Sequence, residues 1–401
     1  MELNEKAYGL GSNRSVIREI SEYGKKRAAE IGAENVFDFS IGNPSVEVPK
    51  EVSRVIKELL KTQNSVSLHG YTSAQGDFNT RKAVSDSLNK RFDLNLAPNN
   101  IYMTCGAMAS IAISLKAVLN HGEECVVFAP FFTEYSLLIE NAGGKVVVSN
   151  PKPDMQIDIA DFKAKIIENT RAVIINSPNN PSGVVYPSST VKKLCQVLKD
   201  KEQQYGKTIY LIADEPYREL VYNGVKVPYV MNYYDDSMVC YSYSKTLSLP
   251  GERIGYVAVN PAMKRADDVY LAICGAGRML GYVCAPSLFQ HVITRCADVK
   301  VNVKVYKANR DMMYNALTEY GYECVKPDGA FYLFVKALEP DAVMFAEQAL
   351  KKDILVVPCD DFGVQGYVRI AYCVSPDTIK RALPKFKELI EQYKLQPHCN
   401  V

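Results

Sequence analysis

Short runs of apolar and β-branched residues alternate with longer amphipathic segments between residues 100 and 260. The short runs have the length and composition of buried strands. They cover residues 100–104, 124–128, 145–149, 171–176, 208–213, 238–242 and 253–259. In one intervening segment, Met108, Ile111, Leu115 and Leu119 recur with the spacing of a helix that buries one face. The alternation predicts an α/β fold in which helices cover a mostly parallel, seven-stranded sheet.

The pattern changes after about residue 290. A long helical segment is followed by predicted strands at 330–335 and 367–371 and by a charged helix at 377–394. We therefore expect a large domain over residues 51–290 and a smaller α+β domain over residues 291–401. Residues 1–50 do not follow the alternation of strand and helix. We expect them to form an N-terminal arm that contributes part of the small domain or contacts a partner chain.

Charge and composition limit the function classes. Lys and Arg number 47 and Asp and Glu 45, so the net charge of +2 gives no reason to expect a nucleic-acid partner or an anionic membrane. No apolar stretch is long enough to span a membrane and the first residues lack a secretory signal, which favours a cytoplasmic protein. The 11 cysteines form no C-x-x-C pair and the 4 histidines lie far apart. We therefore expect reduced thiols and no metal site.

Candidate chemistry gathers directly after the predicted strands, at the edge where open parallel sheets bind ligands. The start of a helix at Gly106, Ala107 and Met108 suits a phosphate, because its free N–H groups and positive dipole end attract an anion. The other segments are Ser177-Pro178-Asn179-Asn180-Pro181-Ser182-Gly183, Asp214-Glu215-Pro216-Tyr217 and Ser242-Tyr243-Ser244-Lys245, with Arg253 beyond them. Together they offer a lysine for an aldehyde, an acid for a ring nitrogen and donors for a phosphate. These are the groups that pyridoxal 5′-phosphate needs.

From roughly residue 39 to residue 371 the chain resembles the class I aminotransferases, which are pyridoxal-phosphate enzymes of fold type I. The resemblance rests on four motifs in the family's order and spacing. They are Asn180-Pro181-Ser182-Gly183, Ala213-Asp214-Glu215-Pro216-Tyr217, Ser242-Tyr243-Ser244-Lys245 followed by Arg253-Ile254-Gly255, and Tyr367-Val368-Arg369-Ile370. It implies a transaminase similar to aspartate aminotransferase.

The resemblance also implies a role for each matching residue around the cofactor. Lys245 is the Schiff-base lysine and the base that moves the α-proton of the substrate. Asp214 pairs with the protonated ring nitrogen, and Tyr217 and Asn180 bond the phenolate oxygen. The groups implied for the phosphate are the backbone amides of Gly106, Ala107 and Met108, the hydroxyls of Ser242 and Ser244, and the guanidinium of Arg253.

Five further residues are implied at the ring, the substrate and a subunit boundary. Phe132 stacks on the cofactor ring, while Arg369 binds the substrate α-carboxylate with a backbone contact from Gly42. Tyr71 reaches the phosphate of the other subunit, which implies a homodimer with shared active sites. Arg278 is a candidate for the second carboxylate of a dicarboxylic substrate, although an ordinary surface or interface arginine is the simpler interpretation. The expected substrates are aspartate or glutamate with 2-oxoglutarate, ahead of an aromatic amino acid.

The same residues also serve other reactions of this fold. A C–S β-lyase or a synthase that uses the same cofactor is the nearest alternative. A regulator that binds the cofactor without turnover is an alternative of a different class, although the chain has no basic patch for DNA. A nicotinamide enzyme is disfavoured, because the glycines at 275–281 have the wrong spacing and follow no strand.

Overall fold

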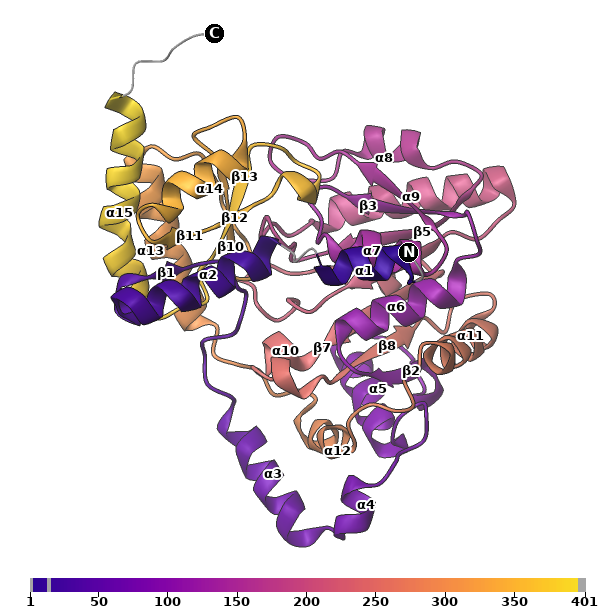
Figure 1. The fold of residues 1–401 in the computed structure, drawn as a ribbon. Coiled ribbons are helices and arrows are strands. Elements are labelled where there is room, and N and C mark those ends of the chain that lie inside the picture. The colour runs from indigo at the N-terminus through magenta and orange to yellow at the C-terminus, as the bar shows by residue number, and fades with distance from the viewer. Residues whose placement is uncertain (1–2, 13–15, 396–401) are drawn as a thin grey trace.

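The structure is a computed structural model that describes residues 3–12 and 16–395. Its centre is a seven-stranded sheet in the order β2-β8-β7-β6-β5-β3-β4 (Figure 1). The strands are β2 (Ile101–Thr104), β3 (Glu124–Phe128), β4 (Lys145–Ser149), β5 (Thr170–Asn176), β6 (Tyr210–Asp214), β7 (Ser237–Ser242) and β8 (Gly255–Val259). Only β8 runs against its two neighbours, and the other pairs are parallel. The predicted fold class is confirmed.

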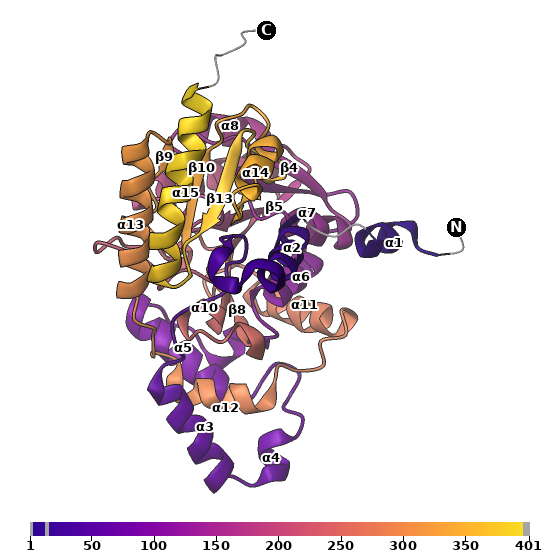
Figure 2. The same ribbon diagram turned by 60° about the vertical axis from the view of Figure 1, so that its left-hand side comes forward.

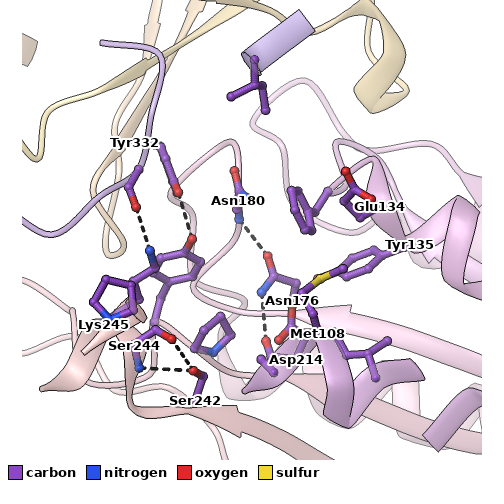
Figure 3. Close-up of a pocket in the computed structure, with 18 of the residues that line it drawn as sticks. Met108, Glu134, Tyr135, Asn176, Asn180, Asp214, Ser242, Ser244, Lys245 and Tyr332 are labelled. Atoms are coloured by element: carbon purple, nitrogen blue, oxygen red, sulfur yellow. Dashed lines mark hydrogen bonds between the residues drawn. The ribbon is translucent and has the colours of Figure 1, made fainter. Parts of the chain in front are cut away.

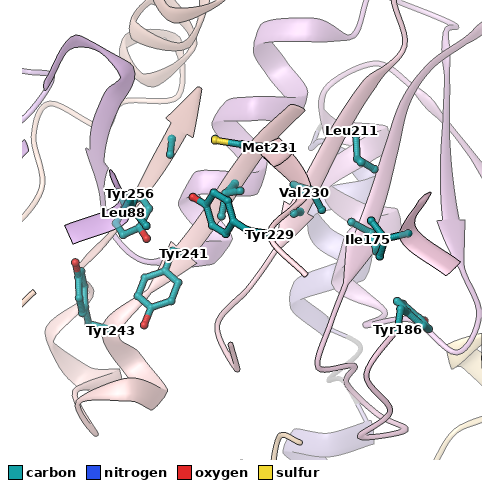
Figure 4. Packing of buried hydrophobic residues seen from close by; sticks show 14 of the residues in the cluster. Leu88, Ile175, Tyr186, Leu211, Tyr229, Val230, Met231, Tyr241, Tyr243 and Tyr256 are labelled. Atoms are coloured by element: carbon teal, nitrogen blue, oxygen red, sulfur yellow. The ribbon is translucent and has the colours of Figure 1, made fainter. Parts of the chain in front are cut away.

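Helices cover both faces of this sheet. The helices of this unit are α3 (Lys50–Thr62), α4 (Ser65–His69), α5 (Phe78–Phe92), α6 (Ala107–Val118), α7 (Glu134–Asn141), α8 (Ile159–Lys165), α9 (Ser188–Tyr205), α10 (Tyr243–Thr246), α11 (Ala266–Met279) and α12 (Ser287–Cys296). Of these, α3 and α4 pack against α12 instead of the sheet. Apolar residues of α6, α7 and α11 form one core with the sheet, and those of α5, α8, α9 and α12 form another. Figure 4 shows part of the second core, where Ile175 and Leu211 lie on neighbouring strands and Tyr241 and Tyr256 stack. Strands buried on both faces are continuous apolar runs, which is why the sequence locates them well.

A smaller antiparallel sheet, in the order β12-β13-β10-β9, stands beside the large one. Its strands are β9 (Cys324–Val325), β10 (Tyr332–Lys336), β12 (Val357–Pro358) and β13 (Tyr367–Ala371), and its helices are α13 (Lys304–Tyr320), α14 (Ala342–Leu350) and α15 (Pro376–Leu395). Short 3-10 helices lie at Ala33–Asn35, Pro98–Asn100, Val230–Asn232, Pro250–Glu252 and Asp360–Phe362. The described elements thus include the smaller α+β unit.

The N-terminal segment joins this smaller unit. Strand β1 (Phe37–Asp38) pairs in parallel with β11 (Ile354–Leu355), and α2 (Val16–Ile31) packs against β11 and β12. By contrast, α1 (Glu5–Ser12) buries no residue and projects from the molecule (Figure 2). These contacts attach the N-terminal segment to the small unit. The domain boundaries at residues 50 and 290 stay predictions.

Two details differ from the expected elements. Arg253 is not in a strand: it follows the 3-10 helix Pro250–Glu252 with a left-handed backbone at φ 52°, and β8 begins only at Gly255. Asp214 is the last residue of β6 rather than the first residue after it.

All described cysteines are free thiols, and Cys399 lies outside the described residues. Within residues 3–12 and 16–395, none of the helices has the length and apolar character needed to cross a membrane.

Candidate active site

A cavity of about 360 Å³ lies between the carboxyl edge of the large sheet and strands β10 and β13 of the small unit (Figure 3). That volume is within the range of sites for small molecules and cofactors. Twelve of the residues expected at the site line it: Gly42, Ala107, Met108, Phe132, Asn180, Asp214, Tyr217, Ser242, Ser244, Lys245, Arg253 and Arg369. The fold therefore brings together side chains from segments more than 300 residues apart in the sequence.

Three expected residues do not line this cavity. Gly106 lies next to it, as the residue that precedes α6. Tyr71 is 89% exposed, and Arg278 is exposed near the end of α11. A single chain does not place either of these two side chains at the site, so their expected roles depend on a second copy.

Lys245 is held in α10, directly after strand β7. Ser242 caps this helix by accepting a hydrogen bond from the backbone N–H of Ser244. The Lys245 ammonium donates to the carbonyl oxygen of Gly42 at 2.7 Å. Burial lowers the pKa of Lys245 from 10.5 to about 8, and the positive charges of Arg369 and Arg253 add to this effect. A lysine with a lowered pKa is more readily available as a neutral nucleophile for an aldehyde.

Asp214 ends β6 with its carboxylate buried. Its Oδ2 accepts a hydrogen bond from the Tyr135 hydroxyl at 2.5 Å, whereas its Oδ1 is buried and has no hydrogen-bond partner among the residues that the structure describes. Burial raises the pKa of Asp214 from 3.8 to about 7, against the lowering effect of the Tyr135 bond. A buried acceptor without a partner is costly, so this atom is a site for a donor that the chain itself does not supply.

Next to Asp214, an amide chain leads from the sheet to the loop that carries Asn180. Asn176 donates from its side chain to the backbone oxygen of Asp214 at 2.9 Å and accepts from the backbone N–H of Asn180 at 2.8 Å. The Tyr217 hydroxyl lies 2.9 Å from the Tyr332 hydroxyl. Burial, followed by the proximity of Tyr332, raises the pKa of Tyr217 well above its usual value. Tyr217 therefore keeps its proton and can donate it in a hydrogen bond.

The opposite corner of the cavity collects donors for an anion. Gly106 has φ 88°, and a Cβ there would lie 2.7 Å from the Arg253 guanidinium, so only glycine fits without displacing that side chain. Ser242 and Ser244 share a hydrogen bond of 2.6 Å between their hydroxyls. Arg253 donates to the backbone oxygens of Pro250 at 2.8 Å and Cys105 at 3.3 Å. With the N-terminus of α6, these groups form a cradle for a phosphate.

Arg369 occupies the small-unit side of the cavity, on β13. It donates to the side-chain oxygen of Asn180 at 3.1 Å and to the backbone oxygen of Ser40 at 2.7 Å. Its guanidinium carbon lies 4.6 Å from the centre of the Tyr332 ring and 5.8 Å from that of Phe362, and its Nε is buried without a partner. A guanidinium fixed in this way presents donors to a carboxylate.

The cavity also contains residues that the sequence reasoning missed. Asn176 ends β5, and Tyr135 lies in the segment that contains Phe132, so inspection of strand ends and of that segment could have found both. Glu134, from the same segment as Tyr135, also lines the cavity, as do Tyr332 on β10 and Arg18 on α2. The contributions of Tyr332 and Arg18 depend on contacts between distant segments, and no local motif marks them.

Pyridoxal phosphate suits this constellation. The orphan Oδ1 of Asp214 matches a protonated ring nitrogen, the cradle at Gly106 matches a phosphate, and Lys245 matches an aldehyde. A buried lysine, a buried carboxylate and a phosphate cradle on an open α/β sheet define the class of fold-type I pyridoxal-phosphate enzymes.

Comparison with known proteins narrows the class. The sequence matches the family of class I and II aminotransferases over residues 34–386. It is 29% identical to a probable aspartate aminotransferase from Methanocaldococcus jannaschii, over 94% of this chain and 97% of that protein. It is 27% identical to aromatic-amino-acid aminotransferase 2 from Thermococcus litoralis, over 91% of this chain and 94% of that protein.

A solved structure agrees with the sequence relatives. The crystal structure of an aminotransferase from Eubacterium rectale has 52% sequence identity and a TM-score of 0.96, and the match covers 98% of this chain and 99% of that one. The chain therefore belongs to the class I and II aminotransferases. It is a transaminase that depends on pyridoxal phosphate.

Proposed function

We propose that this transaminase moves the amino group between L-aspartate or L-glutamate and 2-oxoglutarate in two half-reactions of a ping-pong cycle. The observation that carries transamination of an α-amino acid is the convergence of Lys245, Asp214 and Arg369 on one cavity. The relative from Methanocaldococcus jannaschii, named as a probable aspartate aminotransferase, supports the choice of substrate. When bound, pyridoxal phosphate supplies the electron sink that makes the substrate α-proton acidic. The protein supplies orientation, charge and proton transfer.

We assign the cofactor side of the cavity to the sheet edge. Lys245 would hold the cofactor aldehyde and, once released by a substrate amine, move the proton from the substrate Cα. Asp214 would pair with the ring nitrogen, and Tyr217 and Asn180 would bond the phenolic oxygen. Phe132 would pack on the ring. The phosphate would be bound by Gly106, Ala107, Met108, Ser242, Ser244 and Arg253.

We assign the substrate side to Arg369 and Gly42. Arg369 would bind the α-carboxylate through two parallel hydrogen bonds, which fixes the Cα–H bond relative to Lys245. The backbone of Gly42 would line the other side of the same carboxylate. This assignment selects α-amino acids but does not choose among their side chains.

The side-chain preference rests on a cation for the second carboxylate. Arg278 from a second copy is the candidate we propose, and Arg18 is an alternative in the same chain because it lines the cavity. An aromatic substrate is a second candidate, since Ile17, Met108 and Ile111 also line the cavity with apolar surface. The relative of this chain from Thermococcus litoralis, named as an aromatic-amino-acid aminotransferase, supports the aromatic candidate.

A homodimer with shared sites is part of the proposal. In one chain Tyr71 is 89% exposed, and Arg278 is exposed beside Met279, which is 72% exposed. A second copy that covers this surface would bring Tyr71 to the partner's phosphate and Arg278 to the partner's substrate.

The visible absorbance of the cofactor-loaded protein tests the proposed function. Single L-amino acids are added without any oxo acid, and the released products are measured. We expect aspartate or glutamate to convert the cofactor absorbance to that of its amine form and to release one equivalent of oxo acid. Catalytic release of pyruvate with ammonia or sulfide would instead establish a β-lyase, and binding of the cofactor with no conversion by any amino acid would favour the regulator.

A further inference from the structure

Tyr332 contacts both halves of the proposed site. It is the first residue of β10 and its side chain is only 3% exposed. Its hydroxyl lies 2.9 Å from the Tyr217 hydroxyl, which belongs to the cofactor side. Its ring lies 4.6 Å from the Arg369 guanidinium, which belongs to the substrate side. Figure 3 shows Tyr332 descending from the small unit toward the cavity beside Asn180.

The proposed bond from Tyr217 to the cofactor decides which of the two tyrosine hydroxyls donates to the other. A tyrosine hydroxyl carries one proton, so Tyr217 cannot donate to both Tyr332 and the phenolic oxygen of the cofactor. Tyr332 must then donate to Tyr217, and Tyr217 to the cofactor. Hydrogen bonds in such a chain polarise one another, so the Tyr332 proton strengthens the bond that Tyr217 makes.

The ring of Tyr332 has a different effect. Its centre lies 4.6 Å from the guanidinium carbon of Arg369, and the Phe362 ring lies 5.8 Å from the same carbon. Asn180 and Ser40 accept hydrogen bonds from the guanidinium. A planar cation packed against a buried aromatic face is held in both orientation and position. Gly42 makes room for this arrangement, because a Cβ at that residue would lie 2.0 Å from the Tyr332 hydroxyl.

We propose that Tyr332 is a positioning residue with two separable roles: its hydroxyl orients Tyr217 toward the cofactor, and its ring orients Arg369 toward the substrate α-carboxylate. The inference rests on the proposed roles of Tyr217 and Arg369. It predicts that removal of the hydroxyl alone changes the cofactor environment, whereas removal of the ring also weakens substrate recognition.

Two readouts separate these roles. The pH titration of the visible absorbance of the cofactor-loaded protein reports on the hydrogen bond to the phenolic oxygen. For Tyr332→Phe we expect the midpoint to rise by about half a unit to one unit, with KM for the amino acid within about twofold of wild type. For Tyr332→Leu we expect the same rise of the midpoint as for Tyr332→Phe. We also expect KM for the amino acid to rise about tenfold over wild type, because the ring beside Arg369 is lost.

Controls make the test specific. Tyr322→Phe removes another hydroxyl from a tyrosine that is also 3% exposed but bonds the backbone of Phe386 at 2.8 Å, outside the cavity. We expect this variant to titrate as wild type does. The Tyr217→Phe/Tyr332→Phe double variant should shift no further than Tyr217→Phe alone, because Tyr332 acts through Tyr217.

Failure has distinct forms. A Tyr332→Phe titration equal to wild type, or a double variant with an additive shift, would overturn the hydroxyl role. Equal KM values for the Phe and Leu variants would overturn the ring role; if the Leu variant does not fold, Tyr332→Met replaces it. Should wild-type protein develop no visible absorbance with pyridoxal phosphate, the proposed function fails before Tyr332 is tested.

Discussion

Two clusters of buried charge begin at adjacent residues, Asp214 and Glu215, at the end of β6. Glu215 binds Arg218 through both carboxylate oxygens, and Arg218 also donates to the backbone oxygens of Val227 and Pro228. Asp214 receives one hydrogen bond, from Tyr135, and keeps one oxygen without a partner. The Glu215 carboxylate is fully paired by residues of the chain, whereas the Asp214 carboxylate has an oxygen that a ligand can pair.

The same contrast holds for the other cavity charges. Arg369 has a buried Nε without a partner, and Lys245 donates only to a backbone carbonyl. Among the described residues no ion pair joins Lys245, Asp214 and Arg369 to any carboxylate or cation. Charges near each other but left unpaired are costly to the fold and useful for binding. Substitutions of the cavity charges should therefore lower activity without lowering stability, whereas substitutions in the Glu215 cluster should lower stability.

The largest expected effect comes from Lys245→Ala. Turnover should be abolished, because Lys245 is the one amine among the described residues that line the cavity, and it holds the cofactor aldehyde and accepts the α-proton in the proposed function. The melting temperature should stay the same or rise, because a buried amine whose ammonium form is disfavoured has been removed. Turnover assays and thermal unfolding measure the two effects, with Lys352→Ala as a control lysine that pairs with Glu388 at 3.6 Å. Normal turnover in Lys245→Ala would contradict the assignment.

The next largest effect concerns Asp214 and the pH dependence of the free energy of unfolding of the cofactor-free protein. Burial raises the pKa of Asp214 to about 7 in the folded state, against its ordinary value of 3.8, so the folded state binds the proton more tightly. The contribution of Asp214 to stability therefore falls as the pH rises from about 4 to about 7, by about 4 kcal/mol in all. Asp214→Asn cannot ionise and should lack this loss. Urea unfolding at pH 4 and pH 8 measures the difference between variant and wild type.

Glu215→Ala is the matched counterpart. It would leave the buried Arg218 without its partner, and we expect the free energy of unfolding to fall by about 3–5 kcal/mol. Asp214→Asn at pH 8 should instead be more stable than wild type. The comparison between the two clusters would be wrong if both variants lost the same amount of stability, or if Asp214→Asn followed the wild-type pH profile.

The cavity also shows what local sequence can predict. Asp214 ends a strand, and Lys245 and Asn180 follow strands, whose burial is visible as apolar runs. The residue types of all three suit one cofactor. The apolar run after Arg253 predicts a strand that includes this residue, but its left-handed backbone follows the 3-10 helix Pro250–Glu252. Tyr332 reaches the cavity only because β10 pairs with β13 and the small unit lies against the large one. Such long-range packing leaves no local pattern in the sequence.

The smallest expected effect concerns charges that are neither buried nor paired in the clusters above. Arg278 is exposed in one chain, and Arg18 is exposed at the cavity. If a second copy supplies the cation for a dicarboxylic substrate, Arg278→Ala should raise KM for aspartate about tenfold, the value of one charge-assisted hydrogen bond, and leave KM for phenylalanine unchanged. Arg18→Ala should then change neither value.

Steady-state kinetics with both amino acids, on wild type and both variants, distinguishes the sources of specificity. A selective loss in Arg18→Ala alone would place the second carboxylate against α2 of the same chain and remove Arg278 from the site. If each variant changed KM for aspartate and KM for phenylalanine by the same factor, neither arginine would bind a second carboxylate, and the aromatic candidate would be favoured. Sedimentation of the wild-type protein completes the test, because Arg278 can act on a partner's substrate only in a dimer, and a monomer with full activity would contradict that role.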